Sequence, residues 1–338
     1  MTKKLRAAVA GASGYAGMTA VHLLAHHPAV ELSQLTSRSY AGKRYTVVFP
    51  LLEVEGEFVP EPAADGLDVI FSCLPHNLGA AKVRSWLDAG IRVIDMSADF
   101  RLHDASEYPT WYRQPHPEPA LLQQAVLGLP ELHEQQLKEA RLVAVPGCYA
   151  TASILGLAPA VSAGLVGSDI VVDAKSGVSG AGRSVGLGTH FSEVDESVGA
   201  YAIDGHRHLP EILQELGALG RNGKVQVTFV PHLVPMVRGI LATCYFDLKG
   251  SVEQLRDVYR EFYAGQPFTK VVERTPTTKL ATHTNLCLVN VSAQGGKAVV
   301  TSALDNLVKG ASGQGVECFN IAFGFPRTTA LEGATQWP

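Results

Sequence analysis

The sequence predicts an α/β protein with two parts: a doubly wound Rossmann domain with a parallel sheet, and a second α+β domain with a mixed or antiparallel sheet. Three observations predict this class. A short apolar strand at residues 5–10 runs directly into a glycine-rich turn and a helix. Strands and helices then alternate with short turns as far as Asp95, a pattern typical of parallel sheets. The second half carries mostly strands, which bracket two helical stretches.

The elements of the first half follow from apolar runs and from the residues that interrupt them. Helix 18–26 ends near Pro28, and helix 80–89 is followed by Gly90, a residue type that commonly follows the end of a helix. Residues 104–120 are rich in proline and histidine and are predicted to form an irregular connection. The strands predicted in this half are 5–10, 30–35, 68–73 and 91–95.

The second half is predicted from β-rich runs and amphipathic stretches. Two helices are expected at 210–219 and 252–262, and the segment from Asp305 onward reads as helical and apolar. The predicted strands are 170–174, 225–230, 239–246 and 298–302.

Composition excludes several classes of protein. The 338 residues carry a net charge of −4, which has the wrong sign for a protein that binds nucleic acid by neutralising phosphates. Hydrophobic residues make up 46%, too many for a disordered chain, and no apolar run is long enough to span a bilayer. Five cysteines without a CxxC pair predict neither a disulfide framework nor a zinc site. The basic N-terminus reads as a first strand and not as an export signal, so the cytoplasm is the expected location.

The first turn carries Gly11, Gly14 and Gly17 in the pattern G-x-x-G-x-x-G between a strand and a helix. Glycine there allows a tight turn and a close approach of the backbone to a pyrophosphate, and the helix start offers N–H groups and a positive dipole end. The pattern therefore predicts dinucleotide binding. The alternative is a glycine-rich turn that binds no ligand.

The second strand ends in Thr36, Ser37 and Arg38, without the acidic residue that usually binds the ribose hydroxyls of NAD. A pair of hydroxyls and a cation suit a 2′-phosphate, so the sequence favours NADP over NAD. The alternative is that Arg38 is a solvated surface charge.

Cys148 differs from the other four cysteines, which we expect to be small core residues. It follows Pro146 and Gly147 and precedes an apolar helix, so it lies at or near a helix start, where the dipole favours a thiolate. A thiolate at that place can attack an acyl carbon, and nearby N–H groups can hold the oxyanion.

His206 and His208 project to the same side of an extended segment before a helix, and either can serve as general acid or base. A metal site is disfavoured because no third ligand is evident. His26, His27, His103, His116 and His133 are expected at the surface.

Two further segments carry cations. Residues 175–183 form a predicted glycine- and serine-rich loop with Lys175 and Arg183, which suits an anionic substrate group or is a flexible surface loop. Residues 231–239 form a proline-punctuated stretch that supports the site or a subunit contact.

Together these motifs resemble the N-acetyl-γ-glutamyl-phosphate reductases of arginine biosynthesis over essentially the whole chain. The Pro-Gly-Cys-Tyr-Ala-Thr stretch is highly specific to that family, whereas the glycine turn recurs in many reductases. The resemblance rests on Gly11–Gly17, Val143–Ala152, Ser176–Arg183, His206–Ile212, Pro231–Gly239 and Asp305–Gly315.

The resemblance implies a mechanism and a domain plan. The Cys148 thiolate attacks an acyl phosphate, a thioester forms with loss of phosphate, and NADPH delivers hydride to give N-acetylglutamate semialdehyde. A histidine of the pair acts as acid or base, with His206 slightly favoured. Residues 1–147 would bind NADP, residues 148–309 would hold the substrate and assemble a dimer or tetramer, and residues 310–338 would return to the first domain.

The site residues are assigned accordingly. Besides Cys148, His206 and His208, the residues expected to bind substrate are Arg101, Lys175, Ser176, Arg183 and Glu211. The residues expected to bind NADP are Gly11, Ser13, Gly14, Tyr15, Gly17, Ser37, Arg38, Cys73, Pro75, Ser179, Gly180, Asn306 and Gly310. Residues 101–120 are expected to form a variable lid.

Three other functions are less consistent with the sequence. A lysine-pathway reductase acting on a carrier-linked aminoadipyl phosphate would need a basic docking face, and residues 175–183 are not basic enough. An aspartyl-phosphate reductase has a different cysteine context. A non-enzymatic NADP sensor would leave Cys148 and the histidine pair unexplained.

Overall fold

The computed structural model describes residues 3–220 and 225–333, which form two compact units. The first unit consists of Met1–Pro146 and Ala311–Glu332, and the second contains Gly147–Gly310. The last five residues of the segment predicted to return to the first domain, 334–338, lie outside the described residues.

The first unit is built on a six-stranded parallel sheet, as predicted. Its strands are β1 (Leu5–Ala10), β2 (Val30–Leu35), β3 (Val69–Ser72), β4 (Arg92–Asp95), β5 (Ala125–Leu127) and β6 (Leu142–Ala144). The order β2-β1-β3-β4-β6-β5 places β1 between β2 and β3, so the direction of winding reverses there. In such sheets ligands bind outside the carboxyl ends of the strands at this reversal, which here is the glycine turn after β1.

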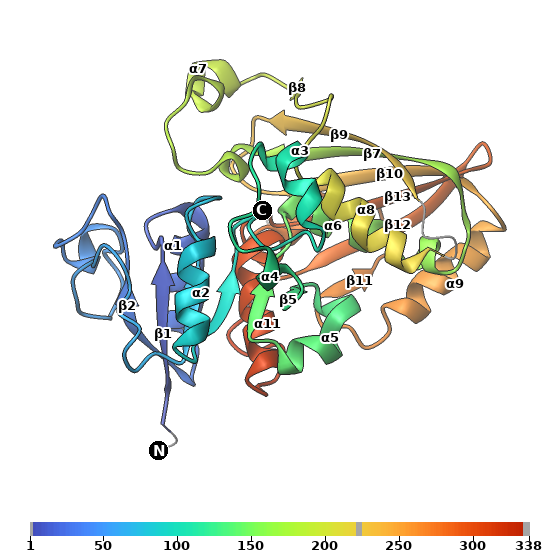
Figure 1. Cartoon of the computed structure of the whole chain (residues 1–338). Helices are drawn as coiled ribbons and strands as arrows, with labels where there is room; N and C mark the ends of the chain where they lie inside the picture. Colours follow the sequence, from blue (N-terminus) through green and yellow to red (C-terminus); the bar gives the residue numbers. More distant parts are fainter. Residues whose placement is uncertain (1–2, 221–224, 334–338) are drawn as a thin grey trace. The chain divides into compact units, whose positions relative to one another are not determined.

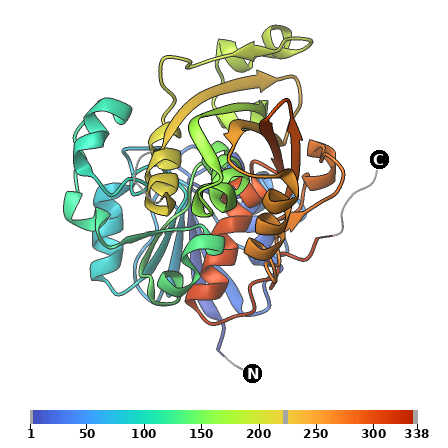
Figure 2. The same ribbon diagram turned by 90° about the vertical axis from the view of Figure 1, so that its right-hand side faces the viewer.

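Helices complete the first unit. They are α1 (Tyr15–Ala25), α2 (Ala80–Asp88), α3 (Tyr108–Tyr112), α4 (Pro119–Leu122), α5 (Pro130–Glu139) and α11 (Gly313–Ala322). Short 3₁₀ turns lie at Tyr45–Val47 and Ala105–Glu107. Although α11 comes from the end of the chain, it packs against α1, α5 and β4 (Figures 1 and 2).

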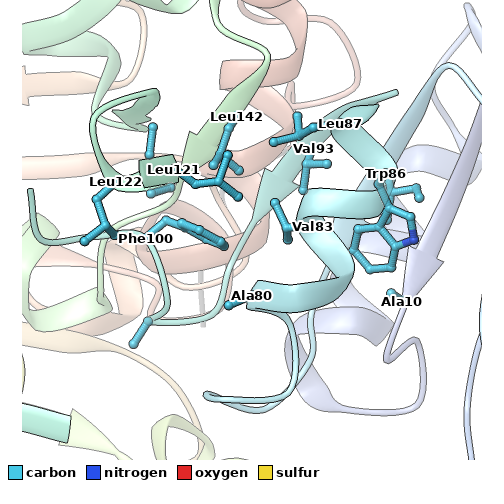
Figure 3. Packing of buried hydrophobic residues seen from close by; sticks show 14 of the residues in the cluster. Ala10, Ala80, Val83, Trp86, Leu87, Val93, Phe100, Leu121, Leu122 and Leu142 are labelled. Carbon is cyan, nitrogen blue, oxygen red and sulfur yellow. The ribbon is translucent and has the colours of Figure 1, made fainter. Parts of the chain in front are cut away.

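The hydrophobic core of this unit corrects the expectation for residues 104–120. In Figure 3, Val83 and Leu87 of α2 lie beside Val93 of β4. Tyr108 and Tyr112 of α3 belong to the same buried cluster. Residues 104–120 are therefore not an irregular connection, because two short helices anchor the segment in the core. The variable lid stays a prediction.

Two histidines expected at the surface are buried instead. His27 is 2% exposed; its Nε2 lies 3.0 Å from the Asn320 side-chain oxygen and its Nδ1 accepts the Ala29 N–H. His116 is 8% exposed and bonds the Asp99 carbonyl oxygen. Burial lowers the pKa of both imidazoles, so each is held as a neutral hydrogen-bonding group.

The C-terminal segment of the first unit is held by one arginine. The Arg327 guanidinium bonds the buried Glu317 carboxylate at 2.6 Å and the Glu134 carboxylate of α5 at 3.0 Å. Glu317 lies on α11, so Arg327 links the chain after α11 to both helices. Breaking a buried pair of this kind leaves an uncompensated charge, which typically costs about 3–5 kcal/mol.

The second unit contains a seven-stranded mixed sheet of order β11-β12-β13-β10-β7-β9-β8. Its strands are β7 (Val166–Gly177), β8 (Gly199–Ala200), β9 (Gln226–Val234), β10 (Ile240–Leu248), β11 (Thr269–Val271), β12 (Cys287–Gln294) and β13 (Lys297–Leu304). Strands β7 and β9 run parallel, as do β11 and β12, and the other neighbours are antiparallel.

Two predicted loops belong in part to this sheet. Lys175 and Ser176 lie in β7, paired with β9 on one side and β10 on the other, so the predicted loop begins only after Gly177. The stretch predicted from Pro231 likewise starts as the end of β9. Strand β12 was not predicted from the sequence.

Helix α6 (Cys148–Ser162) is the central helix of the second unit, and the others are α7 (Phe191–Val194), α8 (Leu209–Leu219), α9 (Val252–Phe262) and α10 (Thr278–Ala281). A π-helical turn covers Val308–Ser312. Residues 149–161 of α6 are all buried, and the helix packs on β10, β13, α8 and α9 (Figure 1). A helix that is apolar on every side has to be enclosed in this way. Cys244, Cys287 and Cys318 are buried core residues, as expected.

Across residues 3–220 and 225–333, none of the helices has the length and apolarity required to cross a membrane.

Candidate functional site

The glycine turn has the geometry that close approach of a phosphate needs. Gly11 has φ +79°, and a Cβ there would lie 2.6 Å from the Cys73 carbonyl oxygen. A Cβ on Gly17 would lie 2.3 Å from the Gly11 carbonyl oxygen, so the first turn of α1 is pressed onto the loop. Gly14 caps α1, whose first turn holds no acidic side chain. The turn therefore offers backbone N–H groups and a positive helix end to an anion.

The predicted contacts of the ribose phosphate lie beside this turn. The Ser13 and Ser37 hydroxyls are 2.8 Å apart, and Ser37 is buried. The Arg38 side chain is 68% exposed and lies 3.4 Å from Glu61. Lys82 of α2 also pairs with Glu61, and these two cations, Lys82 before Arg38, lower the pKa of that carboxyl. Lys82 was missed by sequence reasoning, because nothing in its spacing placed it near Arg38.

Three other predicted cofactor residues lie around the same loop. Cys73 is half-buried, its carbonyl faces Gly11, and burial raises the pKa of its thiol. Tyr15 and Pro75 are exposed. Cys73 thus contributes its backbone to the turn, and its thiol is held in the neutral form.

Cys148 is the first residue of α6, so the predicted helix start is confirmed. The Gly147 N–H donates to the buried Glu211 carboxylate at 2.8 Å. A Cβ on Gly147 would lie 2.2 Å from Nε2 of His208, and a Cβ on Gly310 would lie 2.7 Å from the Cys148 Cβ. The absence of a side chain at Gly147 therefore lets His208 pack against the backbone just before Cys148, and at Gly310 it lets the chain pack against Cys148 itself.

The two histidine rings lie together, with centroids 4.6 Å apart, but the predicted extended segment is wrong, since residues 207–208 form a turn before α8. The His208 N–H donates to Nδ1 of His206 at 3.1 Å. Burial, followed by the charge of Arg207, lowers the pKa of His206 to about 4. His206 is therefore neutral near pH 7, and because Nδ1 accepts a backbone N–H, its proton sits on Nε2.

Polar residues surround the end of β7. Asn306 donates to the Ser179 hydroxyl at 3.0 Å and accepts the Gly239 N–H at 2.8 Å. A Cβ on Gly180 would lie 2.9 Å from the Ser176 hydroxyl oxygen. The chain at 236–239 bonds the backbone of residues 177–179, so the proline-punctuated stretch supports this turn.

The predicted cations have different surroundings. Lys175 lies 2.6 Å from Asp173, which also pairs with His232 at 3.1 Å. Arg183 is exposed. Arg238 lies 3.4 Å from the buried Asp305 carboxylate. Asp173 and His232 were missed from the sequence; the alternation along β7 places Asp173 and Lys175 on one face of the sheet.

Arg101 belongs to the first unit and is 7% exposed. Its Nε donates to the Val145 carbonyl oxygen at 2.8 Å and one Nη to the Met96 carbonyl oxygen at 3.0 Å. It therefore fixes the backbone that leads toward Cys148. A substrate contact for Arg101 stays a prediction.

In the part of the chain that the structure describes, no cluster of three or more histidine, cysteine or acidic side chains is placed to hold a metal ion.

The two units and the thiol at the start of α6 define a protein of the semialdehyde dehydrogenase class. Residues 6–140 match the family model of the semialdehyde dehydrogenase NAD binding domain, and residues 148–306 match that of the semialdehyde dehydrogenase dimerisation domain. The fold is also that of aspartate semialdehyde dehydrogenase II from Vibrio cholerae. That structure, a complex with ASA, matches with a TM-score of 0.74 at 17% identity over 96% of this chain and 99% of its own.

Sequence relatives define the family further. An N-acetyl-gamma-glutamyl-phosphate reductase of Dehalococcoides mccartyi is 47% identical over 99% of this chain and all of its own length. That of Symbiobacterium thermophilum is 49% identical over 98% of both chains. The chain belongs to the N-acetyl-gamma-glutamyl-phosphate reductase family, and is an oxidoreductase.

Proposed function

We propose that the protein reduces N-acetyl-γ-glutamyl phosphate to N-acetyl-L-glutamate 5-semialdehyde with release of phosphate, through a thioester on Cys148. The observation that carries the proposal is the position of Cys148 as the first residue of α6, next to Gly310 and directly after Gly147, against which His208 packs. The identity with relatives that bear this name over nearly their whole length favours this substrate over the carrier-linked aminoadipyl phosphate. The cytoplasmic location stays a prediction.

The first chemical step uses the start of α6. The Cys148 thiolate forms a bond to the acyl carbon, and the carbonyl oxygen takes up the negative charge. N–H groups in the first turn of α6 have no acceptor within the helix and can stabilise this oxyanion. When the C–O bond to phosphate breaks, its electron pair leaves with the phosphate and a thioester remains on Cys148.

The second step is the reduction of the thioester. When bound, NADPH supplies the hydride. The chain then has to stabilise a second oxyanion and release the thiolate as the C–S bond breaks and the aldehyde forms. We assign His206 the role of a neutral donor through Nε2–H to the reacting oxygen, because its Nδ1 is already occupied by the His208 N–H.

The remaining predicted residues divide by their surroundings. Lys175 and Arg183 are accessible cations of the second unit and are proposed to bind the anionic groups of the substrate. The buried Glu211 carboxylate accepts the Gly147 N–H, and we propose that this bond fixes the turn before Cys148. Cofactor contacts from Ser179, Gly180, Asn306 and Gly310 stay a prediction.

NADP is the proposed form of the cofactor. The first unit carries a fitting cradle, since Gly11 and Gly17 leave no room for a Cβ and Ser13 and Ser37 are paired at its side. Among the described residues, Arg38 and Lys82 are both paired with the same carboxylate, that of Glu61, so two cations here face one acidic side chain. A 2′-phosphate is the group of NADP that needs such a corner.

The reaction run in reverse tests the substrate. With phosphate and NADP, N-acetylglutamate semialdehyde is expected to give NADPH, followed by its absorbance, whereas aspartate semialdehyde is expected to give almost none. The same assay without phosphate is the control, because the thioester then has no acceptor. Faster turnover of aspartate semialdehyde, or of a carrier-linked aminoadipate semialdehyde, would contradict the proposal.

The second unit is proposed to assemble with a second copy of the chain. Cys244 of β10 faces α6, so its neighbour Tyr245 points to the opposite face of the sheet, in register with Val171 and Val299. Val171 is 38% exposed although it lies in a central strand. Large apolar side chains are also exposed on the connection after β7, namely Val185, Leu187, Phe191, Val198 and Ile203. Apolar surface of this extent typically marks an interface.

The wild-type protein is expected to sediment as a dimer or tetramer, and Val171→Glu as smaller species, because a charge would be buried in the interface. Arg260→Glu, at an exposed ion pair of α9, serves as the control and should leave the assembly unchanged, because α9 packs against α6, on the other face of the sheet. A wild-type monomer at micromolar concentration would refute this assignment.

A further inference from the structure

The Tyr149 hydroxyl has a fixed position but no role in the proposed mechanism. Tyr149 follows Cys148 in α6 and is 2% exposed. Its hydroxyl donates to the His232 carbonyl oxygen of β9 at 2.8 Å and accepts the Tyr201 hydroxyl at 3.4 Å. Burial, followed by the neighbouring Tyr201 and Cys148, raises its pKa, so the phenol stays protonated. Because the Tyr149 hydroxyl donates its proton to a backbone carbonyl, it is not positioned to protonate a substrate.

The ring of Tyr149 packs against both imidazoles. Its centroid lies 5.6 Å from that of His206 at an interplanar angle of 86°, and 6.0 Å from that of His208 at 63°. Phe229 of β9 contacts the rings of both Tyr149 and His206. Edge-to-face contacts of this kind favour one ring orientation over others. The orientation of His206 is thus set by aromatic neighbours and by one backbone bond.

We infer that Tyr149 is a positioning residue for the histidine pair. The bond from its hydroxyl to His232 fixes its ring between α6 and β9, and the ring fixes His206 in the orientation in which Nδ1 accepts the His208 N–H. The inference rests on the proposed function, in which His206 donates from Nε2 to the reacting oxygen. Tyr201 strengthens the arrangement from the chain that follows β8.

Tyr149→Phe tests this, because it keeps the ring and removes only the hydroxyl. We expect kcat to fall by about three- to tenfold, the usual range for losing one neutral hydrogen bond, with KM for the acyl substrate within about twofold. The pH dependence should change as well. A less firmly packed His206 is more hydrated, so its pKa rises from about 4 toward the ordinary 6.5. Protonation at Nδ1 breaks the bond from the His208 N–H, so the variant should lose activity at pH 5.5 relative to pH 8.

Tyr259→Phe is the matched control. Tyr259 is also fully buried in the second unit, and its hydroxyl donates to the Gly156 carbonyl oxygen of the same helix α6 at 2.6 Å. The Tyr259→Phe variant loses the same kind of bond as Tyr149→Phe, so the melting temperatures of the two variants should fall by similar amounts. In Tyr259→Phe, however, the ratio of kcat at pH 5.5 to kcat at pH 8 should stay at the wild-type value. Tyr201→Phe should also lower the ratio of kcat at pH 5.5 to kcat at pH 8, but by less than Tyr149→Phe does.

Two results would overturn the inference. One is a Tyr149→Phe enzyme with the wild-type kcat and pH ratio. The other is a loss of activity that is the same at both pH values and matches that of Tyr259→Phe, which would be a purely structural effect. Either result together with an inactive Cys148→Ser enzyme refutes the positioning role alone. An active Cys148→Ser enzyme refutes the proposed function instead.

Discussion

Replacing Cys148 by serine is expected to lower kcat for N-acetylglutamyl phosphate reduction by about four orders of magnitude or more, the scale on which removal of a covalent nucleophile acts. A helix start favours the thiolate of a cysteine, whereas the much less acidic hydroxyl of a serine stays protonated there. NADPH affinity should stay unchanged, because the glycine turn and Arg38 belong to the other unit. Steady-state kinetics and a binding titration with NADPH measure the two quantities.

Cys244→Ser is the matched control for this variant. Cys244 is fully buried on β10, and burial raises the pKa of its thiol to about 12, so it cannot supply a thiolate near neutral pH. This variant should keep its activity and lose some stability. Full activity in Cys148→Ser, or an equal loss in both variants, would exclude the thioester mechanism.

Replacing Arg38 by aspartate is expected to raise KM for NADPH by about 10- to 100-fold, since a hydrogen bond to a charged group is worth about 1.5–3 kcal/mol. The side chain is 68% exposed, so it is accessible to a ligand, and Glu61 at 3.4 Å competes for it only weakly. The new carboxylate would also repel the 2′-phosphate. KM for NADH, which lacks that phosphate, should change by less than about threefold on the scale of surface charge effects.

Arg260→Asp makes the same change of charge at an exposed ion pair of α9 in the second unit. It should leave KM for both nucleotides at the wild-type values, which separates a local contact from an effect of net charge. If Arg38→Asp raised KM for NADPH and NADH equally, the 2′-phosphate assignment would be wrong.

Elements with strong local signals could be predicted from the sequence. Strand β2 and helix α9 have the predicted bounds, because an apolar run or an amphipathic period is interrupted at each end by turn residues or a cap such as Ser251. The start of α6 at Cys148 was also predictable, since Pro146 and Gly147 interrupt the chain directly before a long apolar stretch. The proximity of His206 and His208 was predicted for the wrong reason, because a turn bonded from the His208 N–H to Nδ1 of His206, and not an extended segment, brings the rings together.

Features that depend on distant residues could not be predicted. His27 is buried because it bonds Asn320, which is 293 positions away in the chain. Lys175 and Ser176 belong to β7 because β9 and β10 pair on both sides, whereas the local sequence before Gly177 resembles a loop. Tyr149 was part of a recognised motif, yet its hydroxyl partner is a backbone carbonyl of β9, and backbone acceptors leave no mark in a sequence.

The bonds from Arg327 to α5 and α11 join parts of the first unit that are far apart in the chain. The nucleotide-binding unit is discontinuous, and its sheet lacks α11 until residues 311–332 have been synthesised. The unit with Cys148 is nearly continuous between Gly147 and Gly310, so it is available for folding earlier during translation. Domains usually fold from the N-terminus onward as they leave the ribosome. Here the surfaces of α1, α5 and β4 that α11 covers leave the ribosome long before that helix is made.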